Sequence, residues 1–223
     1  MSQGALIVLD GADGAGKATQ TKLLVEQLRQ AGTSVRTLDF PQYEQNVFGK
    51  LLRECLDGER GDFLSVDPRI AATLYAADRF ESKETIMGWL AAGDTVVLDR
   101  YVSSNMLHQG AKLTDQKELE DFLQWLDTIE HGVFGLPRPD IILYLDVPYS
   151  LRQSMLFKDD TRTTIDTAES NIAHQLEAES NAKRVVAAHN VWRSIPCVAE
   201  GALLPPDEIA ALVYSEVQTV LSK

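Results

Sequence analysis

Short runs of apolar residues recur along the chain, and longer stretches with helical spacing separate them. Five runs have the length and composition of buried strands: ALIVLD (5–10), SVRTLDF (34–40), DTVVLDR (94–100), DIILYLDV (140–147) and IPCVAE (195–200). Apolar runs joined by helical segments are typical of parallel strands linked by crossover helices. The pattern therefore predicts an α/β fold with a five-stranded parallel sheet and helices on both of its faces.

Five segments between and after these runs have helical character. In residues 19–31, Leu23, Leu24 and Leu28 are expected on one face, and Gly32 follows as a helix stop. This segment joins the first two strands and so completes a βαβ unit. The other predicted helices cover 68–92, 115–130, about 167–189 and 206–221. Because no linker or repeat interrupts the 223 residues, we expect a single domain over 1–223.

A glycine-rich segment, GADGAGK (11–17), directly follows the first predicted strand and directly precedes the first helix. In this context a GxxxxGK pattern predicts a phosphate loop: glycines turn the backbone tightly, its N–H groups face the phosphates, and the lysine adds a charge. An ordinary strand-to-helix turn is the alternative, but it has no need of a lysine that opens the helix. The predicted triphosphate-binding residues are Gly11, Ala12, Asp13, Gly14, Ala15, Gly16, Lys17, Ala18 and Thr19.

The residue after Lys17 departs from the usual pattern, in which a Ser or Thr ligates magnesium. Ala18 occupies that place, and Thr19 follows it. Three of the strand runs have a carboxylate at or next to their last residue: Asp10, Asp99 and Asp146. Ligands of open parallel sheets gather at the carboxyl ends of the strands. We therefore take Thr19 and Asp99 as the candidate metal ligands.

The acidic composition limits the partners. A formal charge of -12 and a pI near 4.7 argue against a nucleic-acid partner, which needs basic patches to bind phosphate. Small phosphorylated ligands are still compatible, because a few converging basic groups form a local positive site. Cys55 and Cys197 have no metal or redox spacing, and the first residues contain no membrane span or signal peptide. We expect a cytoplasmic protein with no membrane partner.

Six further segments carry a resemblance that is more specific than the phosphate loop: FPQY (40–43), FGKLL (48–52), LYAADRF (74–80), LDRYVSSNMLHQGAK (98–112), PRPDIILYLDVP (137–148) and DTAE (166–169). In this order they resemble the thymidylate kinases, which are P-loop nucleoside monophosphate kinases. The resemblance implies a P-loop NTPase fold, transfer of the γ-phosphoryl group of ATP to dTMP, Mg²⁺ as cofactor, and a homodimer. The alternatives are a kinase for another nucleotide or nucleoside, and a P-loop scaffold protein that binds nucleotide without transferring phosphate.

The resemblance also implies roles in the acceptor site. Asp13 contacts the deoxyribose 3′-hydroxyl, Arg100 binds the acceptor phosphate, Tyr75 stacks on the base, and Arg79 donates to a thymine carbonyl. Each role has a structural alternative: a loop cap for Asp13, an ion pair of Asp99 with Arg100, a core position for Tyr75, and a surface charge for Arg79. The remaining residues of the implied dTMP site are Phe40, Pro41, Tyr43, Ser104, Asn105, His108 and Gln109.

A small mobile lid over ATP is expected at about residues 150–166, where Arg152, Lys158 and Arg162 lie among polar residues. The family places a catalytic arginine either in the phosphate loop or in this lid, and the loop position here is Gly14. The lid arrangement is therefore implied, with a solvated helix surface as the alternative. The predicted catalytic residues are Lys17, Asp13, Asp99, Arg100, Arg162 and Lys158.

Overall fold

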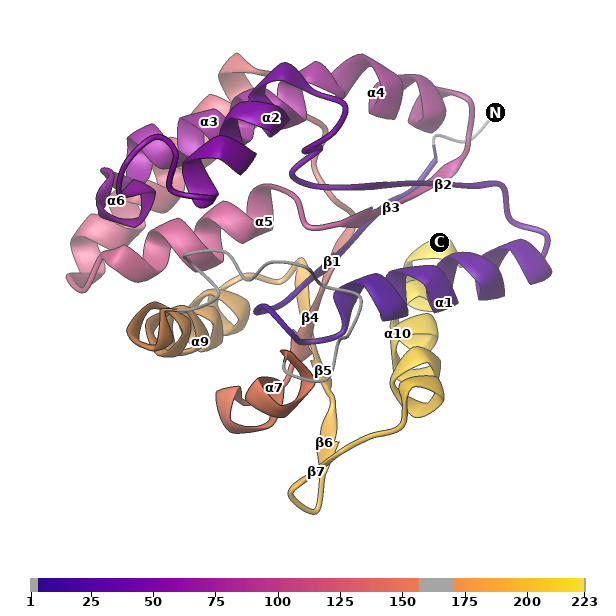
Figure 1. The fold of residues 1–223 in the computed structure, drawn as a ribbon. Coiled ribbons are helices and arrows are strands. Elements are labelled where there is room, and N and C mark those ends of the chain that lie inside the picture. Colours follow the sequence, from indigo (N-terminus) through magenta and orange to yellow (C-terminus); the bar gives the residue numbers. More distant parts are fainter. Residues whose placement is uncertain (1–3, 157–170, 223) are drawn as a thin grey trace.

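A five-stranded parallel sheet forms the centre of the molecule, in a computed structural model that describes residues 4–156 and 171–222 (Figure 1). Its strands lie in the order β2-β3-β1-β4-β5. They are β1 (Leu6–Asp10), β2 (Val35–Asp39), β3 (Thr95–Asp99), β4 (Ile141–Asp146) and β5 (Trp192–Pro196). The predicted sheet is confirmed. Because β1 lies between β3 and β4, the order reverses at its carboxyl end, where open sheets bind ligands.

Helices cover both faces of the sheet, as predicted, because successive strand residues point to opposite sides. Ile7 and Leu9 pack with α1 (Lys17–Gln30) and α10 (Pro206–Leu221). On the opposite face, Leu6 and Val8 pack with residues of α4 (Lys83–Ala91) and α9 (Ile172–Ala188). Figure 1 shows α1 and α10 together on one side of the sheet and α4 and α9 on the other.

The prediction of a single helix over 68–92 is wrong, because the helix is interrupted at Ser82. The first part is α3 (Pro68–Glu81), which packs against α2 (Val47–Leu56), whereas α4 packs on the sheet through Ile86 and Leu90. Ser82 is buried, and its hydroxyl receives a hydrogen bond from Asn46 at 3.2 Å. Two helices with different packing partners need different directions, so the chain turns between them.

The last predicted strand, 195–200, is displaced in the sequence. The strand β5 begins at Trp192 and ends at Pro196, with Trp192 beside Ile142 of β4. Val198 and Ala199, from the expected second half, instead form β6 (Val198–Ala199), which pairs antiparallel with β7 (Ala202–Leu203). As an edge strand, β5 contains exposed Arg193 and Ser194, which interrupt the apolar run that a central strand shows.

Several helical segments were not expected from the sequence. One is α2, and another is a continuous helical segment formed by α5 (Val102–Ser104), η2 (Asn105–Gln109) and η3 (Gly110–Lys112). We call the second segment the 102–112 helix. Its middle part has π-type hydrogen bonding, a feature that is frequent at functional sites. The remaining elements are η1 (Phe63–Ser65), α6 (Gln116–Leu126), η4 (Asp127–Val133) and α7 (Tyr149–Leu156).

The lid expected at 150–166 falls partly outside the described residues. Lys158 and Arg162 lie outside them, whereas residues 150–156 belong to α7. Arg152 is not a lid charge, because its side chain is fully buried. Within the described part of the chain, no helix combines the length and the low polarity that a membrane span requires.

Candidate active site

The predicted phosphate loop connects β1 to α1 at the sheet edge where the strand order reverses. Gly16, at the start of the helix, has a φ of 85°, and Gly14 has a φ of 76°; side chains disfavour both values. The Lys17 ammonium folds back over the loop and donates to the carbonyl oxygens of Gly11 at 3.1 Å and Ala12 at 2.9 Å. The loop therefore has a lysine already held at the place where phosphates would bind.

Burial sets the charge state of Lys17, whose side chain is almost completely covered. Desolvation, together with the positive charge of Arg100, outweighs the opposing effect of Asp13 and Asp99 and lowers its pKa from 10.5 to about 8. The amine is consequently charged at neutral pH but loses its proton within one or two pH units above it. A phosphate ligand would favour the charged form.

This pKa predicts how ATP binding responds to pH. Below about pH 8 Lys17 is an ammonium that attracts triphosphate, and above pH 8 the neutral amine predominates. We expect the Kd of ATP to rise by about tenfold per pH unit once the pH exceeds that pKa. Calorimetric titration between pH 7.5 and 9.5 measures this slope. In Lys17→Arg the charge persists, so the affinity should not change with pH; equal slopes in both proteins would contradict the assignment.

A cavity beside the phosphate loop collects the predicted acceptor residues. Every one of the eleven residues implied for dTMP lines it, from Asp13 through Gln109. Four more residues line the same cavity and were not expected: Leu56, Phe63, Leu64 and Lys112. The Phe63 and Tyr75 rings lie 6.1 Å apart between centroids, so two aromatic side chains form part of one wall. Aromatic rings and charged groups therefore face the same cavity.

Arg100 is one of the basic residues that line this cavity, and its backbone has a φ of 66°, which is rare outside glycine. Its guanidinium donates to a carboxylate oxygen of Asp13 and to Nε2 of His108 at 3.2 Å. Because an arginine has no acceptor, His108 must accept in this contact, with Nε2 unprotonated. The expected alternative partner, Asp99, is not the carboxylate that pairs with Arg100.

Charge coupling fixes the ionisation of this pair. Burial alone would raise the pKa of Asp13, but the charges of Arg100 and Lys17 outweigh it and hold that pKa far below its usual value. Burial acts to lower the pKa of Arg100, but the carboxylates of Asp13 and Asp10 outweigh it, and the pKa of Arg100 lies above its ordinary value. Both groups therefore stay charged at physiological pH, and Arg100 remains a cation suited to a phosphate.

Asp13 is also held from the opposite side, by Arg152 of α7 and Gln175 of α9. Gln175 donates to the Asp13 carboxylate at 3.1 Å, and Arg152 donates to the Asp13 carbonyl oxygen at 3.1 Å. The Arg152 guanidinium also bonds Gln175 at 3.0 Å and pairs with Glu179 at 3.2 Å. This buried network replaces the lid role expected for Arg152: the residue fixes the phosphate loop. Its partners lie on α9, which the sequence pattern did not connect with the loop.

Arg79 is fully buried, so its interpretation as a surface charge is wrong. It makes a two-pronged ion pair with Glu130, which is also fully buried, with a 2.8 Å bond from Nε. Glu130 accepts a further bond from Asn105 at 2.8 Å. One buried carboxylate therefore orients two of the predicted base-contacting residues, and no motif in the sequence identified it.

The motif at 48–52 has a packing explanation in this site. Gly49 of α2 lies against the 40–43 segment, where an added Cβ would be 2.1 Å from the carbonyl oxygen of Gln42. Only a glycine permits this approach. The close contact holds Phe40, Pro41 and Tyr43 at the wall of the acceptor cavity.

The candidate metal ligands differ in position. Thr19 is exposed on α1, whereas Asp99 is half-buried, and desolvation raises its pKa although Lys17 and Arg100 oppose the shift. Within residues 4–156 and 171–222, no cluster of three or more His, Cys, Asp or Glu side chains could hold a metal ion. A cation held mainly by protein side chains is therefore not supported by the described residues.

Comparison with known proteins decides the family. A family model described as thymidylate kinase matches residues 9–191, which is most of the chain. The chain belongs to the thymidylate kinase family. The thymidylate kinase of Mycobacterium tuberculosis H37Rv is 41% identical over 146 residues, spanning 66% of this chain and 67% of that protein. The human thymidylate kinase is 39% identical over 145 residues, spanning 65% of this chain and 62% of that protein.

A solved structure shows the same fold. The thymidylate kinase of Candida albicans superimposes with a TM-score of 0.76 and covers 98% of this chain and 93% of that one, at 22% sequence identity. The family predicted from the motifs is thereby confirmed, as is the P-loop NTPase type of the fold. The individual residue roles implied by the family stay predictions.

Proposed function

We propose that this thymidylate kinase family member transfers the γ-phosphoryl group of ATP to dTMP, giving ADP and dTDP. The observation that carries the proposal is the acceptor cavity, because all eleven residues implied for dTMP line it, next to the phosphate loop. These residues come from four separate stretches of the sequence: 11–17, 40–43, 74–80 and 98–112. Their convergence on one cavity is not expected if the motifs only maintained the fold.

Arg100 supports a phosphate monoester as the acceptor. Its guanidinium already binds the Asp13 carboxylate, and the same fork geometry suits two phosphate oxygens. An acceptor phosphate would take the place of that carboxylate on Arg100. Asp13, still held by Gln175, would then be free to orient the sugar hydroxyl, as the resemblance implies.

The base contacts fit a ring that has both an N–H donor and a carbonyl. The buried side-chain oxygen of Gln109 has no hydrogen-bond partner among the described residues, and it could accept from thymine N3–H. Each terminal nitrogen of Arg79 carries two hydrogens, so Nη1 has one beyond its 3.3 Å bond to the Tyr101 carbonyl for a thymine carbonyl. Tyr75 and Phe63 supply apolar ring surface for the base.

Transfer itself needs positive charge around the moving phosphoryl group, whose oxygens share the negative charge in the transition state. Lys17 supplies one cation from the phosphate loop, and Arg100 holds the acceptor phosphate. Arg162 is proposed as the further catalytic cation, with Lys158 as its competitor; both lie outside the described residues. Arg152 is less suited to this role, because its buried guanidinium is already bound to Gln175 of α9 and to the Asp13 carbonyl oxygen.

Magnesium is proposed to reach the site with the nucleotide. Ala18 has no hydroxyl, so the cation would be held mainly by phosphates and water, with Asp99 or Asp13 nearby and Thr19 as a further candidate. When bound, magnesium would neutralise charge on the bridging phosphates. The Asp99 carboxylate interacts with Lys17, which places it close to the loop.

A homodimer in the cytoplasm completes the proposal. Large apolar side chains are exposed on α2 and α3: Val47 is 73% exposed, Ile70 61% and Phe80 48%. Exposed apolar side chains gathered on neighbouring helices are typical of association surfaces. The acidic charge argues against a nucleic-acid partner.

The decisive experiment is an acceptor panel. We expect the purified protein with ATP and Mg²⁺ to convert dTMP to dTDP at a higher kcat/KM than dUMP, dCMP, dGMP or AMP. Chromatography of the products measures each conversion. Equal or faster transfer to another acceptor would support a different nucleotide kinase. Binding of ATP and dTMP without any dTDP would support the non-catalytic alternative.

A further inference from the structure

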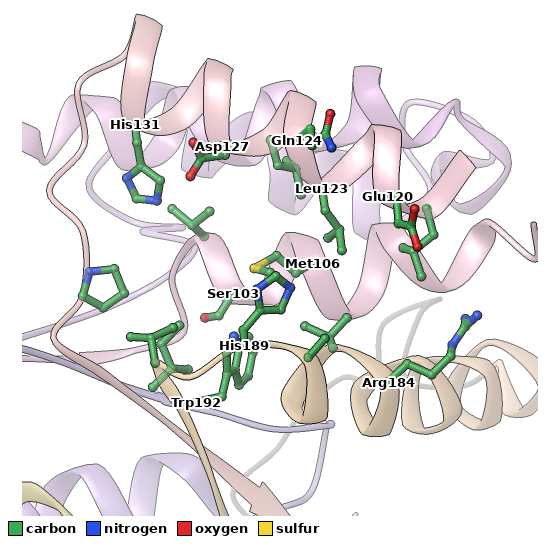
Figure 2. A pocket seen from close by; sticks show the side chains of 18 of the residues that line it. Ser103, Met106, Glu120, Leu123, Gln124, Asp127, His131, Arg184, His189 and Trp192 are labelled. Atoms are coloured by element: carbon green, nitrogen blue, oxygen red, sulfur yellow. The ribbon is translucent and has the colours of Figure 1, made fainter. Parts of the chain in front are cut away.

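A second cavity, of about 790 Å³, lies on the other side of the 102–112 helix from the acceptor cavity (Figure 2). Residues of α6 and η4 form one wall, and residues of α9 and the start of β5 form the other. Ser103 and Met106 of the 102–112 helix line this cavity, whereas Ser104 and His108 line the acceptor cavity. The two cavities share a helix as their wall, so both can be filled at once.

Its interior suits a flat aromatic molecule. Met106, Leu123, Val185 and Trp192 give it an apolar lining, and thioether and indole groups pack well on aromatic rings. The volume lies within the roughly 300 to 1,000 Å³ of pockets that enclose small organic ligands. None of the residues predicted for ATP or dTMP lines it. The proposed kinase reaction therefore leaves this cavity without a role.

Trp192 indicates where a ligand would be recognised. Its side chain is 3% exposed, and its indole nitrogen has no hydrogen-bond partner among the described residues. Figure 2 shows the Trp192 ring at the floor of the cavity, below Ser103 and Met106. A buried N–H without an acceptor is unfavourable. A ligand atom that accepts from this N–H would satisfy it, so the ligand needs an acceptor at its buried end.

The rim of the cavity favours a negative group at the outer end. Two acidic side chains on the α6 and η4 side are already engaged: Asp127 binds Arg138 at 2.9 Å, and Glu120 binds Gln116 at 2.8 Å. Across the opening, Arg184 of α9 makes one long contact, 3.4 Å to Asn181, among the described residues. Figure 2 shows Arg184 at the edge of the cavity. Of these rim charges, Arg184 thus has the weakest contact, and it is a cation.

We propose that this cavity binds a fused-ring aromatic carboxylate whose ring contains a hydrogen-bond acceptor, while nucleotides occupy the active site. The ring acceptor would bond Trp192 Nε1, the rings would lie between Met106 and Val185, and the carboxylate would face Arg184. Only binding is proposed, and no bond in the ligand is made or broken. The proposal does not depend on which nucleotide is the acceptor.

The test uses 2-phenylquinoline-4-carboxylate as the probe, with saturating ADP and dTMP present to occupy the nucleotide sites. The chain has three tryptophans, so proton–nitrogen NMR spectra contain three indole signals, and Trp192→Phe identifies the one from Trp192. We expect this signal to move progressively as the probe is added. The isosteric 3-phenylnaphthalene-1-carboxylate, in which CH replaces the ring nitrogen, should bind at least about tenfold more weakly.

Two adjacent alanines provide matched variants. Ala188 lines the cavity and Ala187 does not, and both are exposed, so a larger side chain is compatible with folding at either position. Ala188→Phe should weaken probe binding by about tenfold or more, whereas Ala187→Phe should leave it unchanged. The proposal is overturned if the Trp192 signal does not move, if both probes bind equally, or if the two alanine variants behave alike.

Discussion

Replacing Lys17 by alanine is expected to reduce the kcat of dTMP phosphorylation by about 10³-fold, the largest effect we expect on catalysis. The Lys17 ammonium is held over the phosphate loop by the Gly11 and Ala12 carbonyl oxygens. It therefore meets developing phosphate charge without having to be ordered first. Steady-state kinetics with saturating ATP and dTMP measures the loss.

The control for this prediction lies on the same helix. Lys22 of α1 is exposed, and Lys22→Ala should keep kcat within about twofold, because solvent screens its charge. The fold of Lys17→Ala should persist, since the lost bonds lie within one loop. A thermal unfolding curve that matches the parent protein would show this. Retention of more than a tenth of kcat would mean that another cation carries the transfer.

Replacing Glu130 by glutamine is expected to lower the free energy of unfolding by about 3 to 5 kcal/mol, the largest effect we expect on stability. Glutamine has nearly the same shape, but it leaves the buried Arg79 guanidinium without its counter-charge. Asn105 would lose a carboxylate acceptor as well. Urea unfolding, followed by circular dichroism, measures the change.

Two further variants separate charge from packing. Glu118→Gln changes an exposed glutamate of α6 and should alter stability by less than about 0.5 kcal/mol. The double variant Arg79→Met with Glu130→Gln leaves no buried charge unpaired, so it should regain part of the lost stability. If Glu130→Gln cost less than about 1 kcal/mol, water would have to reach the Arg79 guanidinium.

The sequence predicts the central strands well because burial on both faces requires continuous apolar runs. It fails at β5, where Arg193 and Ser194 face solvent at the sheet edge and hide the strand. The 102–112 helix escapes prediction for a related reason. Some of its residues line the polar acceptor cavity and others line the second, apolar cavity, so its sequence has no single apolar stripe.

The candidate site shows the same limit. Residues that would touch nucleotide stand in recognisable motifs, because a common ligand imposes their type and spacing. Residues that hold them in place have no such pattern. Glu130 is 51 positions from Arg79, and Gln175 is 162 positions from Asp13, so only the folded chain brings each pair together.

The pairing of Arg100 with Asp13 has a consequence for which anions the cavity admits. A guanidinium that already holds a carboxylate discriminates among anions by their charge and shape. Chloride or acetate carries a single charge, as the Asp13 carboxylate does, and gains little by displacing it from Arg100. A phosphate monoester dianion brings more charge and three oxygens, so we expect it to displace that carboxylate from Arg100 more readily than chloride or acetate does. The Asp13 carboxylate would thereby lower the affinity of the cavity for monovalent anions.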